Sequence, residues 1–379
     1  MQGPPSAGLV VSGWTRASAV GDARLGETLE LFDQRPNAGD DRPLRARADS
    51  TPGRTSAYSS ACNCAAADDP FDTTTMTLSI SGSTQVYLIP GDPVRNVRLP
   101  RMFNAVFERF EIDAVLLPMQ VPRRDFAVFF SSAFLARNVR GMLLAPPHKA
   151  LVIDLLDGCG LIGRVAGSVN VVRRTDDNRL EGDLFDGEGL IGALDHYRIP
   201  FRGKRVLVLG AGVSAAAVGV ALVEGGEVNG AAHVAFFDTS AGKAAGVAAK
   251  LDAFFDADVS AVDSNAPEGY DLVVNATPLG LNEGDALPVD VARMERHAAV
   301  FDILLRGQPT PLVQAARARG LNAQAGFEML IQQMPHYLRY FGHEQVARAL
   351  SKDADFLREH IYPPAMQAEI RQPLRYHAP

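Results

Sequence analysis

Short apolar runs alternate with stretches of helical spacing along most of this chain, and this alternation limits the possible folds more than any other feature. The first series of runs occupies 85–90, 114–118 and 139–144. The second series occupies 204–209, 233–238, 271–276 and 299–304. Strands separated by helical patterns of about 10 to 15 residues are typical of crossover units, which build parallel sheets. Two series therefore predict an α/β protein with two domains built on parallel sheets.

The break between the two series lies near 198–203, where Pro200 and Gly203 interrupt the pattern. Residues 327–349 have helical spacing and follow the second series. We expect this last segment to pack back on the first domain.

Residues 1–75 have a different composition from the rest of the 379-residue chain. They contain ten Leu, Ile, Val or Phe, seven Arg, no Lys and ten Asp or Glu. So few large apolar side chains cannot bury enough surface to offset the conformational entropy of folding. We therefore interpret 1–75 as a disordered tail or a misassigned start, with the working protein beginning near Met76. A transit peptide is the alternative, and the ten acidic residues argue against it.

Charge and cysteine content exclude several classes of partner. The chain has 37 Lys and Arg against 44 Asp and Glu, a net charge of -7, so no cationic excess is available for a nucleic-acid backbone. Its three cysteines are too few for a disulfide framework and lack the paired spacing of a zinc site. We expect a cytoplasmic protein with no nucleic-acid partner and no metal. The cysteines are Cys62, Cys64 and Cys159.

One uncharged stretch, 206–223, has the composition of a short membrane span. Its length is marginal for a hydrocarbon core of about 30 Å, and Gly210, Gly212 and Ser214 divide it. Its first part has the pattern of a buried parallel strand, and its second part that of a helix of small residues. We expect no membrane span.

The turn between that strand and helix has the G-x-G-x-x-A pattern of a dinucleotide site. Gly210 permits a tight turn, Gly212 lets a pyrophosphate approach the backbone, and Ala215 allows close packing of helix on strand. The N-terminus of the helix favours an anion. The candidate cofactor-binding residues of this turn are Gly210, Ala211, Gly212, Val213, Ser214 and Ala215.

Asp238 ends the next strand, 233–237. A carboxylate there can accept hydrogen bonds from the adenosine ribose and would repel a 2′-phosphate, which predicts NAD rather than NADP. Two alternatives stay open. Asp238 could instead cap the helix that starts near Ala241, and the nearby Lys243 could soften the discrimination and admit NADP.

The strand 271–276 runs into a segment, 275–280, with the sequence Asn-Ala-Thr-Pro-Leu-Gly, which resembles the cofactor-domain signature of the shikimate dehydrogenase family. The segment 310–320 resembles the stretch that follows this signature in the family, and the similarity extends over about 86–342. The resemblance implies an NAD(P)-dependent alcohol dehydrogenase and further candidate cofactor residues. They are Asn275, Ala276, Thr277, Pro278, Leu279 and Gly326.

The resemblance also implies a function for each part of the chain. It implies a substrate-binding catalytic domain at 76–198 and a Rossmann-type NAD(P)-binding domain at 199–325. The residues 326–379 would form C-terminal helices on the first domain.

Two charged residues of the first domain are candidates for the chemistry. Lys149 follows Pro-Pro-His at the start of a probable helix, and Asp186 lies just before another helix. From the residues alone, both could equally be ordinary surface charges. The resemblance to the P-H-K and N-T-D-G motifs of the family implies that Lys149 transfers the proton and that Asp186 is its partner on the reacting hydroxyl. It implies that Asn170 and Gln333 bind substrate hydroxyls, whereas we expect His148 to form a structural hydrogen bond.

The other end of the substrate site departs from the family pattern. The family S-K-S-P motif is Val-Arg-Leu-Pro here, the family N-V-T is Leu-Leu-Ala, and the family Tyr near the carboxylate is Leu305. A buried carboxylate without donors would cost several kcal/mol, so shikimate itself should bind poorly unless Arg98 replaces the lost donors. The alternative is that Arg98 is an exposed residue beside Arg95 and Arg101. The candidate residues at this end are Val97, Arg98, Leu99, Leu143 and Ala145.

Together these observations predict hydride transfer between NAD(P) and a ring hydroxyl or ketone of a shikimate- or quinate-like cyclic polyol. One alternative is the same chemistry on a less polar cyclic alcohol without a carboxylate. A second is a sensor that binds a dinucleotide without catalysis, which the presence of Lys149 and Asp186 disfavours. We expect a monomer or a homodimer.

Overall fold

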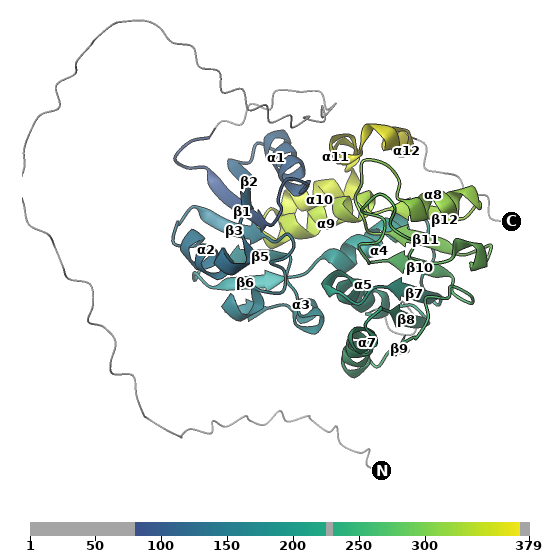
Figure 1. The fold of residues 1–379 in the computed structure, drawn as a ribbon. Coiled ribbons are helices and arrows are strands. Elements are labelled where there is room, and N and C mark those ends of the chain that lie inside the picture. Colours follow the sequence, from purple (N-terminus) through teal and green to yellow (C-terminus); the bar gives the residue numbers. More distant parts are fainter. Residues whose placement is uncertain (1–79, 225–229, 372–379) are drawn as a thin grey trace, which may run out of the picture. The chain divides into compact units, whose positions relative to one another are not determined.

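The computed structural model describes residues 80–224 and 230–371 (Figure 1). The expected tail at 1–75 and the proposed start at Met76 lie outside the described residues. The described part contains two six-stranded sheets with helices around them.

The first sheet has the strand order β2-β1-β3-β5-β6-β4. Strands β1, β2 and β3 are parallel, whereas β5 runs antiparallel to both β3 and β6. The expectation of a wholly parallel first sheet is therefore wrong. The turn between β5 and β6 is short, with the Thr175 amide donating to the Arg179 carbonyl, and only an antiparallel pair can be joined so briefly. The strands are β1 (Gln85–Gly91), β2 (Ala114–Gln120), β3 (Val139–Leu143), β4 (Gly158–Cys159), β5 (Val171–Arg174) and β6 (Leu180–Asp183).

The helices of this region include two that the helical spacing anticipated, α1 and α2. Helix α1 buries Met102, Phe103 and Phe107 against the sheet, and Pro100 in its first turn suits a position without an intrahelical donor. The helices are α1 (Leu99–Arg109), η1 (Arg123–Asp125), α2 (Phe126–Ala133), η2 (Ile153–Leu155), α3 (Leu161–Ala166) and α4 (Asp186–His196).

The second sheet is parallel throughout and has the order β12-β11-β10-β7-β8-β9, the doubly wound arrangement of a Rossmann fold. The uncharged stretch 206–223 forms most of β7 and all of α5, and in the described part of the chain no helix is long and apolar enough to cross a membrane. The elements are β7 (Arg205–Leu209), α5 (Val213–Val223), β8 (His233–Phe237), α7 (Ala241–Phe255), β9 (Val259–Ala261), β10 (Leu272–Asn275), η3 (Val291–Arg293), β11 (Ala299–Asp302), α8 (Pro311–Ala318) and β12 (Asn322–Ala325).

The segment after the second sheet joins the core of the first. Phe327, Tyr337 and Leu357 belong to the same apolar cluster as Tyr87 of β1 and Phe103 of α1. This packing places α9 beside α4, so that both helices border the site described below. The elements are α9 (Phe327–Tyr340), α10 (Glu344–Lys352), α11 (Asp355–Ile361), η4 (Pro364–Met366) and α12 (Gln367–Arg371).

Candidate active site

A cavity of about 280 Å³ brings together residues from the first sheet region, the start of α5 and one face of α9. Eleven of the residues that the sequence singled out line it, although they are spread over more than 200 positions of the chain. They are Val97, Arg98, Leu99, Ala145, Lys149, Asn170, Asp186, Ser214, Leu305, Gly326 and Gln333.

Lys149 and Asp186 form a close ion pair at the cavity wall. Lys149 Nζ donates to Asp186 Oδ2 at 2.6 Å, and the two side chains keep 15% and 7% of their surface exposed. Asp186 is the first residue of α4, where a carboxylate is favoured by the helix dipole. Lys149 lies in a turn before η2, not at the start of a helix as the sequence predicted. The pair is thus fixed and still accessible to a ligand.

Asn170 holds the carboxylate in place from the other side. Its Nδ2 donates to Asp186 Oδ1 at 2.9 Å, and its Oδ1 accepts from the Phe185 amide at 3.2 Å. The loop that carries Asn170 is itself tied to the lysine, since the Val169 amide donates to the Lys149 carbonyl at 2.8 Å. These bonds restrict the orientation of the carboxylate before any substrate arrives.

Ser214 connects this cluster to the glycine-rich turn. It lies in the first turn of α5, and its hydroxyl donates to Asp186 Oδ2 at 3.4 Å. The sequence placed Ser214 with the cofactor and Asp186 with the proton chemistry. In the structure the Ser214 hydroxyl and the Lys149 amine both donate to the same oxygen, Asp186 Oδ2.

Gln333 reaches the cavity from α9. Its Oε1 accepts from the buried hydroxyl of Tyr337 at 2.6 Å, a bond between residues one helical turn apart. Burial raises the pKa of Tyr337 well above its usual range, so this hydroxyl stays a donor. Because Oε1 is occupied, the Gln333 amide is directed by Tyr337, a residue that the sequence analysis did not single out. The four-residue spacing on a predicted helix was the available signal.

His148 is a core residue. It is fully buried, stacks on Phe126 with ring centroids 4.3 Å apart, and shares a hydrogen bond of 2.9 Å with the Val121 carbonyl. Burial lowers its pKa, which favours the neutral imidazole. These contacts agree with the structural hydrogen bond that we expected.

The end of the cavity away from Asp186 is apolar. Val97, Leu99, Ala145 and Leu305 line it, as the departures from the family pattern suggested. Leu143 is a correction, because its side chain is fully buried in the core, away from the cavity. The next residue, Leu144, which directly follows β3, lines the cavity instead. The further lining residues that the sequence analysis did not single out are Ile89, Asn96, Pro146, Ile303, Met329 and Leu330.

Arg98 lies at this apolar end and is half-buried, not an exposed surface residue. Its guanidinium carbon lies 5.2 Å from the centre of the Phe327 ring, and Nη1 donates to the Ile361 carbonyl at 3.3 Å. Together with Lys149 it is one of two cations on the cavity wall.

The glycine-rich turn has the geometry that a dinucleotide needs. Gly210 has a φ of +98°, and a Cβ there would lie 2.8 Å from the Ala276 carbonyl oxygen. Gly212 is the N-cap of α5, and no side chain forms a capping hydrogen bond there. A Cβ added to Gly212 would have no atom within 4 Å, so the space beside it is open. Open amides at a helix N-terminus favour a phosphate, so the residues present fit a dinucleotide.

Asp238 supports this turn directly. One carboxylate oxygen accepts from the Ala211 amide at 2.9 Å, and the other accepts from the amide of Ser240, the N-cap of α7, also at 2.9 Å. The carboxylate therefore lies next to the glycine-rich turn while it also stabilises the start of α7. The two interpretations of Asp238 drawn from the sequence are compatible.

Asn275 has a structural role instead of the cofactor contact assigned to it. Its side chain is fully buried and donates to Asp302 Oδ1 at 3.0 Å, while its Oδ1 accepts from the Thr277 amide and hydroxyl. These bonds shape the turn at Thr277, after which Pro278 and Leu279 are exposed. Gly326, which was grouped with the cofactor, is the N-cap of α9, and an added Cβ would lie 2.5 Å from the Ile303 carbonyl oxygen.

A metal-centred alternative finds no cluster in the described ranges. Within 80–224 and 230–371, no group of three or more His, Cys, Asp or Glu side chains is placed to hold a metal ion.

The chain is similar to proteins of one family in both sequence and structure. Residues 89–172 match the family model of the shikimate dehydrogenase substrate binding domain. The protein named shikimate dehydrogenase (NADP(+)) of Rubrobacter xylanophilus is 34% identical over 258 residues, 67% of this chain and 89% of that protein.

Two solved structures extend the comparison. Quinate dehydrogenase from Corynebacterium glutamicum in complex with NAD has a TM-score of 0.62 and 25% identity, over 71% of this chain and 98% of that one. The ligand-free form of 5-ketofructose reductase of a Gluconobacter strain has a TM-score of 0.61 and 26% identity, with the same coverage of both chains.

Proposed function

Because the chain belongs to the shikimate dehydrogenase family of NAD(P)-dependent dehydrogenases, we propose that it oxidises or reduces a cyclic polyol related to shikimate or quinate. A hydride would move between a ring carbon and the dinucleotide. The observation that carries this proposal is the hydrogen-bonded set of Lys149, Asp186 and Asn170, which opens into the cavity and also contacts Ser214 beside the glycine-rich turn.

NAD(P), when bound, accepts or supplies the hydride. The residues of the chain handle the proton and the orientation. In the direction of oxidation, the proton of the ring hydroxyl passes to Lys149 Nζ as the carbon-bound hydrogen leaves with its electron pair. In the direction of reduction, Lys149 Nζ returns a proton to the carbonyl oxygen. Asp186 holds this amine at 2.6 Å, and Gln333 binds a second ring hydroxyl.

For the cofactor we propose a preference for NAD. Asp238 follows β8, and its carboxylate lies against the amide of Ala211 in the glycine-rich turn. A negative charge at that place would repel the 2′-phosphate of NADP. NADP is the alternative, because the relative in Rubrobacter xylanophilus is a shikimate dehydrogenase (NADP(+)), whereas the quinate dehydrogenase structure contains NAD.

The apolar end of the cavity supports two classes of substrate. The first carries a carboxylate, which the guanidinium fork of Arg98 would bind at this end. The second is a neutral cyclic alcohol or ketone, and Val97, Leu99 and Leu305 favour it because they offer no hydrogen-bond donor from their side chains. The similarity to a reductase named for 5-ketofructose supports the second class.

The decisive experiment measures turnover of shikimate, quinate and neutral cyclic polyols with NAD and with NADP. We expect Lys149→Ala to lower kcat by about 10²- to 10⁴-fold, the usual contribution of a positioned proton-transfer group. The matched control is Lys204→Ala, which removes a lysine from a partly exposed pair with Asp271 on the second sheet. Dinucleotide binding without turnover of any of these substrates would favour the sensor, and turnover unaffected by Lys149→Ala would exclude the mechanism.

A second variant separates the two substrate classes. If the substrate carries a carboxylate, Arg98→Leu should raise its KM by roughly tenfold or more, the cost of a lost charge-assisted hydrogen bond. The KM of a neutral polyol should change little. An unchanged KM for shikimate and quinate in Arg98→Leu would exclude carboxylate binding by Arg98, and the neutral class of substrate would then be favoured.

A further inference from the structure

We infer that helix α11 braces the cavity from behind, with Glu328 and Arg358 acting as positioning residues for the substrate-facing side chains. This inference rests on the proposed function, because it concerns the same cavity. Three sets of contacts carry it.

The first set joins α4 and α9 along their length. A Cβ on Gly189 would lie 2.5 Å from both Gln333 Cγ and the Met329 carbonyl oxygen, and a Cβ on Gly192 would lie 2.8 Å from Gln332 Cβ. Gly189 thus lies beside Gln333, whereas His196, later in α4, lies beside Glu328, earlier in α9, so the two helices run antiparallel at close range. Asp186 and Gln333 lie at the cavity end of this helix pair.

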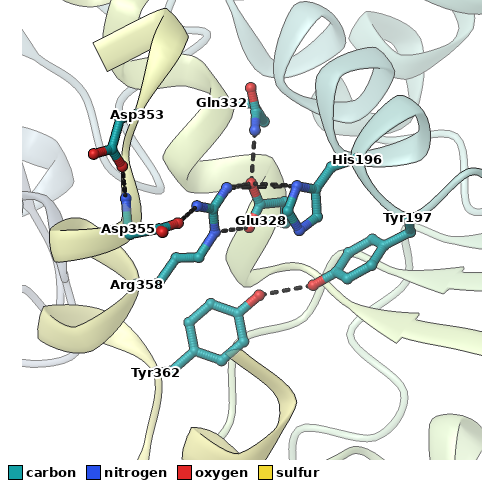
Figure 2. Close-up of polar contacts among 8 residues, drawn as sticks. All are labelled: His196, Tyr197, Glu328, Gln332, Asp353, Asp355, Arg358 and Tyr362. Carbon is teal, nitrogen blue, oxygen red and sulfur yellow. Dashed lines mark hydrogen bonds and ion pairs between the residues drawn. The ribbon is translucent and has the colours of Figure 1, made fainter. Parts of the chain in front are cut away.

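The second set joins the start of α9 to the last turn of α4, and its side chains lie outside the cavity lining (Figure 2). Glu328 of α9 is fully buried and lies 3.7 Å from His196 Nδ1, in the last turn of α4. Gln332 Nε2 donates to Glu328 Oε1 at 2.6 Å. Burial lowers the pKa of His196, so its imidazole is neutral near pH 7 and the carboxylate needs another cation.

The third set supplies that cation from α11. Arg358 binds both oxygens of Glu328, with Nε at 3.0 Å and Nη2 at 2.6 Å. The same helix ends at Ile361, whose carbonyl accepts from Arg98 Nη1, and the next residue, Tyr362, shares a hydrogen bond of 2.7 Å with the Tyr197 hydroxyl. One short segment thus contacts α9, the end of α4 and a residue of the cavity wall.

These contacts imply a mechanical link between the brace and the substrate site. The contacts at Gly189 and Gly192 show that α4 and α9 are closely packed. Packing contacts of this kind resist sliding of one helix along the other less than a bidentate hydrogen bond does. The planar fork of Arg358 on Glu328 fixes both distance and direction. Arg358 Nη2 also lies 3.5 Å from His196 Nδ1 in the last turn of α4, so one guanidinium links both helices. It therefore sets the position of Gln333, about a turn and a half along α9 from Glu328, relative to Asp186.

The test replaces the fork while it keeps the charge. Arg358→Lys should raise KM for the turned-over substrate by roughly three- to tenfold and leave kcat within about twofold, because Gln333 binding is lost and proton transfer is retained. Hydrogen exchange of the α9 amides should accelerate at 333–337 as well as near 328. The matched control is Arg348→Lys, in an exposed pair with Glu344, and it should change neither quantity.

Glu328→Gln is the second variant, for the case in which Arg358→Lys does not fold. It keeps the shape of the side chain and removes the ionic bond, so it should also raise KM and accelerate exchange at 333–337. A merely structural role would lower the folded fraction and apparent kcat with KM unchanged, and this result would overturn the inference. So would unchanged KM and unchanged exchange in both folded variants. If the wild type turns over none of the tested polyols, the proposed function fails, and exchange at 333–337 still decides whether the brace reaches the cavity.

Discussion

Two buried carboxylates lie at opposite ends of the α4–α9 pair, and each binds a cation at 2.6 Å. Asp186 binds Lys149 through one oxygen, and both side chains line the cavity. Glu328 binds Arg358 through both oxygens and is closed off by His196 and other neighbours. The two pairs share chemistry but differ in access to a ligand.

This difference shows why a close ion pair does not by itself mark an active site. The guanidinium of Arg358 stays charged at any physiological pH and fits the carboxylate as a fork, so it contributes geometry. A lysine ammonium is a single point that can exchange a proton with a hydroxyl beside it. Access to the cavity therefore supports the proposed proton transfer by Lys149 and the proposed positioning role of Arg358.

The largest expected effects come from neutralising each carboxylate in turn. Asp186→Asn should lower kcat by about 10²-fold or more, because the amine of Lys149 loses its anchor, and should change the unfolding free energy less than the second variant does. Glu328→Gln should destabilise the fold by about 1.5 to 3 kcal/mol, since the guanidinium loses its buried partner and keeps only the exposed Asp355 as a counter-charge.

Kinetics at saturating substrate and urea unfolding separate these two outcomes. The comparison would fail if Asp186→Asn proved the more destabilising variant, or if Glu328→Gln lost kcat to the same degree at full folding.

A third buried carboxylate, Asp302, extends the comparison to an acid whose described partners are neutral. Its oxygens accept from the Asn275 amide, the Thr310 hydroxyl and the Leu304 backbone amide. Burial raises the pKa of Asp302 to about 6. A folded-state pKa above the unfolded value near ~3.9 means that the stabilisation is present at low pH and is lost as the pH rises through about 6.

We therefore expect the contribution of Asp302 to fall by roughly 3 kcal/mol between about pH 4 and pH 6. Asp302→Asn should remove this part of the pH dependence. Thermal unfolding of both proteins at several pH values measures it. Parallel curves for the two proteins would show that the carboxyl does not titrate in that window.

The smallest expected effect concerns the contact between α4 and α9, the helices that carry Asp186 and Glu328. Gly189→Ala places a methyl group 2.5 Å from the Met329 carbonyl oxygen, which cannot move without shifting α9. We expect a loss of about 1 to 3 kcal/mol, typical of overpacking, with a raised KM. Gly246→Ala on α7 is the control, since its added Cβ would meet no atom within 4 Å. Equal stability and equal KM in the two variants would show that the α4–α9 contact can accommodate a methyl group at position 189.

The fold could be predicted where the signal was local and periodic. The four central strands of the second sheet follow the predicted runs, because each is a short apolar segment, whereas the edge strands β9 and β12 were not predicted. In the first sheet β5 and β6 were missed, since Val-Val-Arg-Arg and Leu-Glu-Gly-Asp are too short and too polar to stand out as strands. Their pairing depends on a hairpin turn and on β3, not on their own sequence.

The site shows the same limit at single-residue scale. Resemblance to a family placed Lys149 and Asp186 in one cavity, but it also named Leu143, whereas the next residue, Leu144, lines the cavity and Leu143 is packed in the core. Asn275 was assigned to the cofactor, and its side chain is fully buried at the end of β10. The domain boundaries at 198 and 325 stay predictions.

The sequence by itself determined the α/β class and the glycine-rich turn, because these depend on periodicity and backbone freedom within short segments, and its resemblance to a family supplied the candidates for proton transfer. Only the tertiary structure decided which charges share a cavity and which are closed off. Asp186 and Glu328 look alike in the chain, and they differ because the packing of α4 and α9 turns Asp186 toward the cavity and buries Glu328 against Arg358.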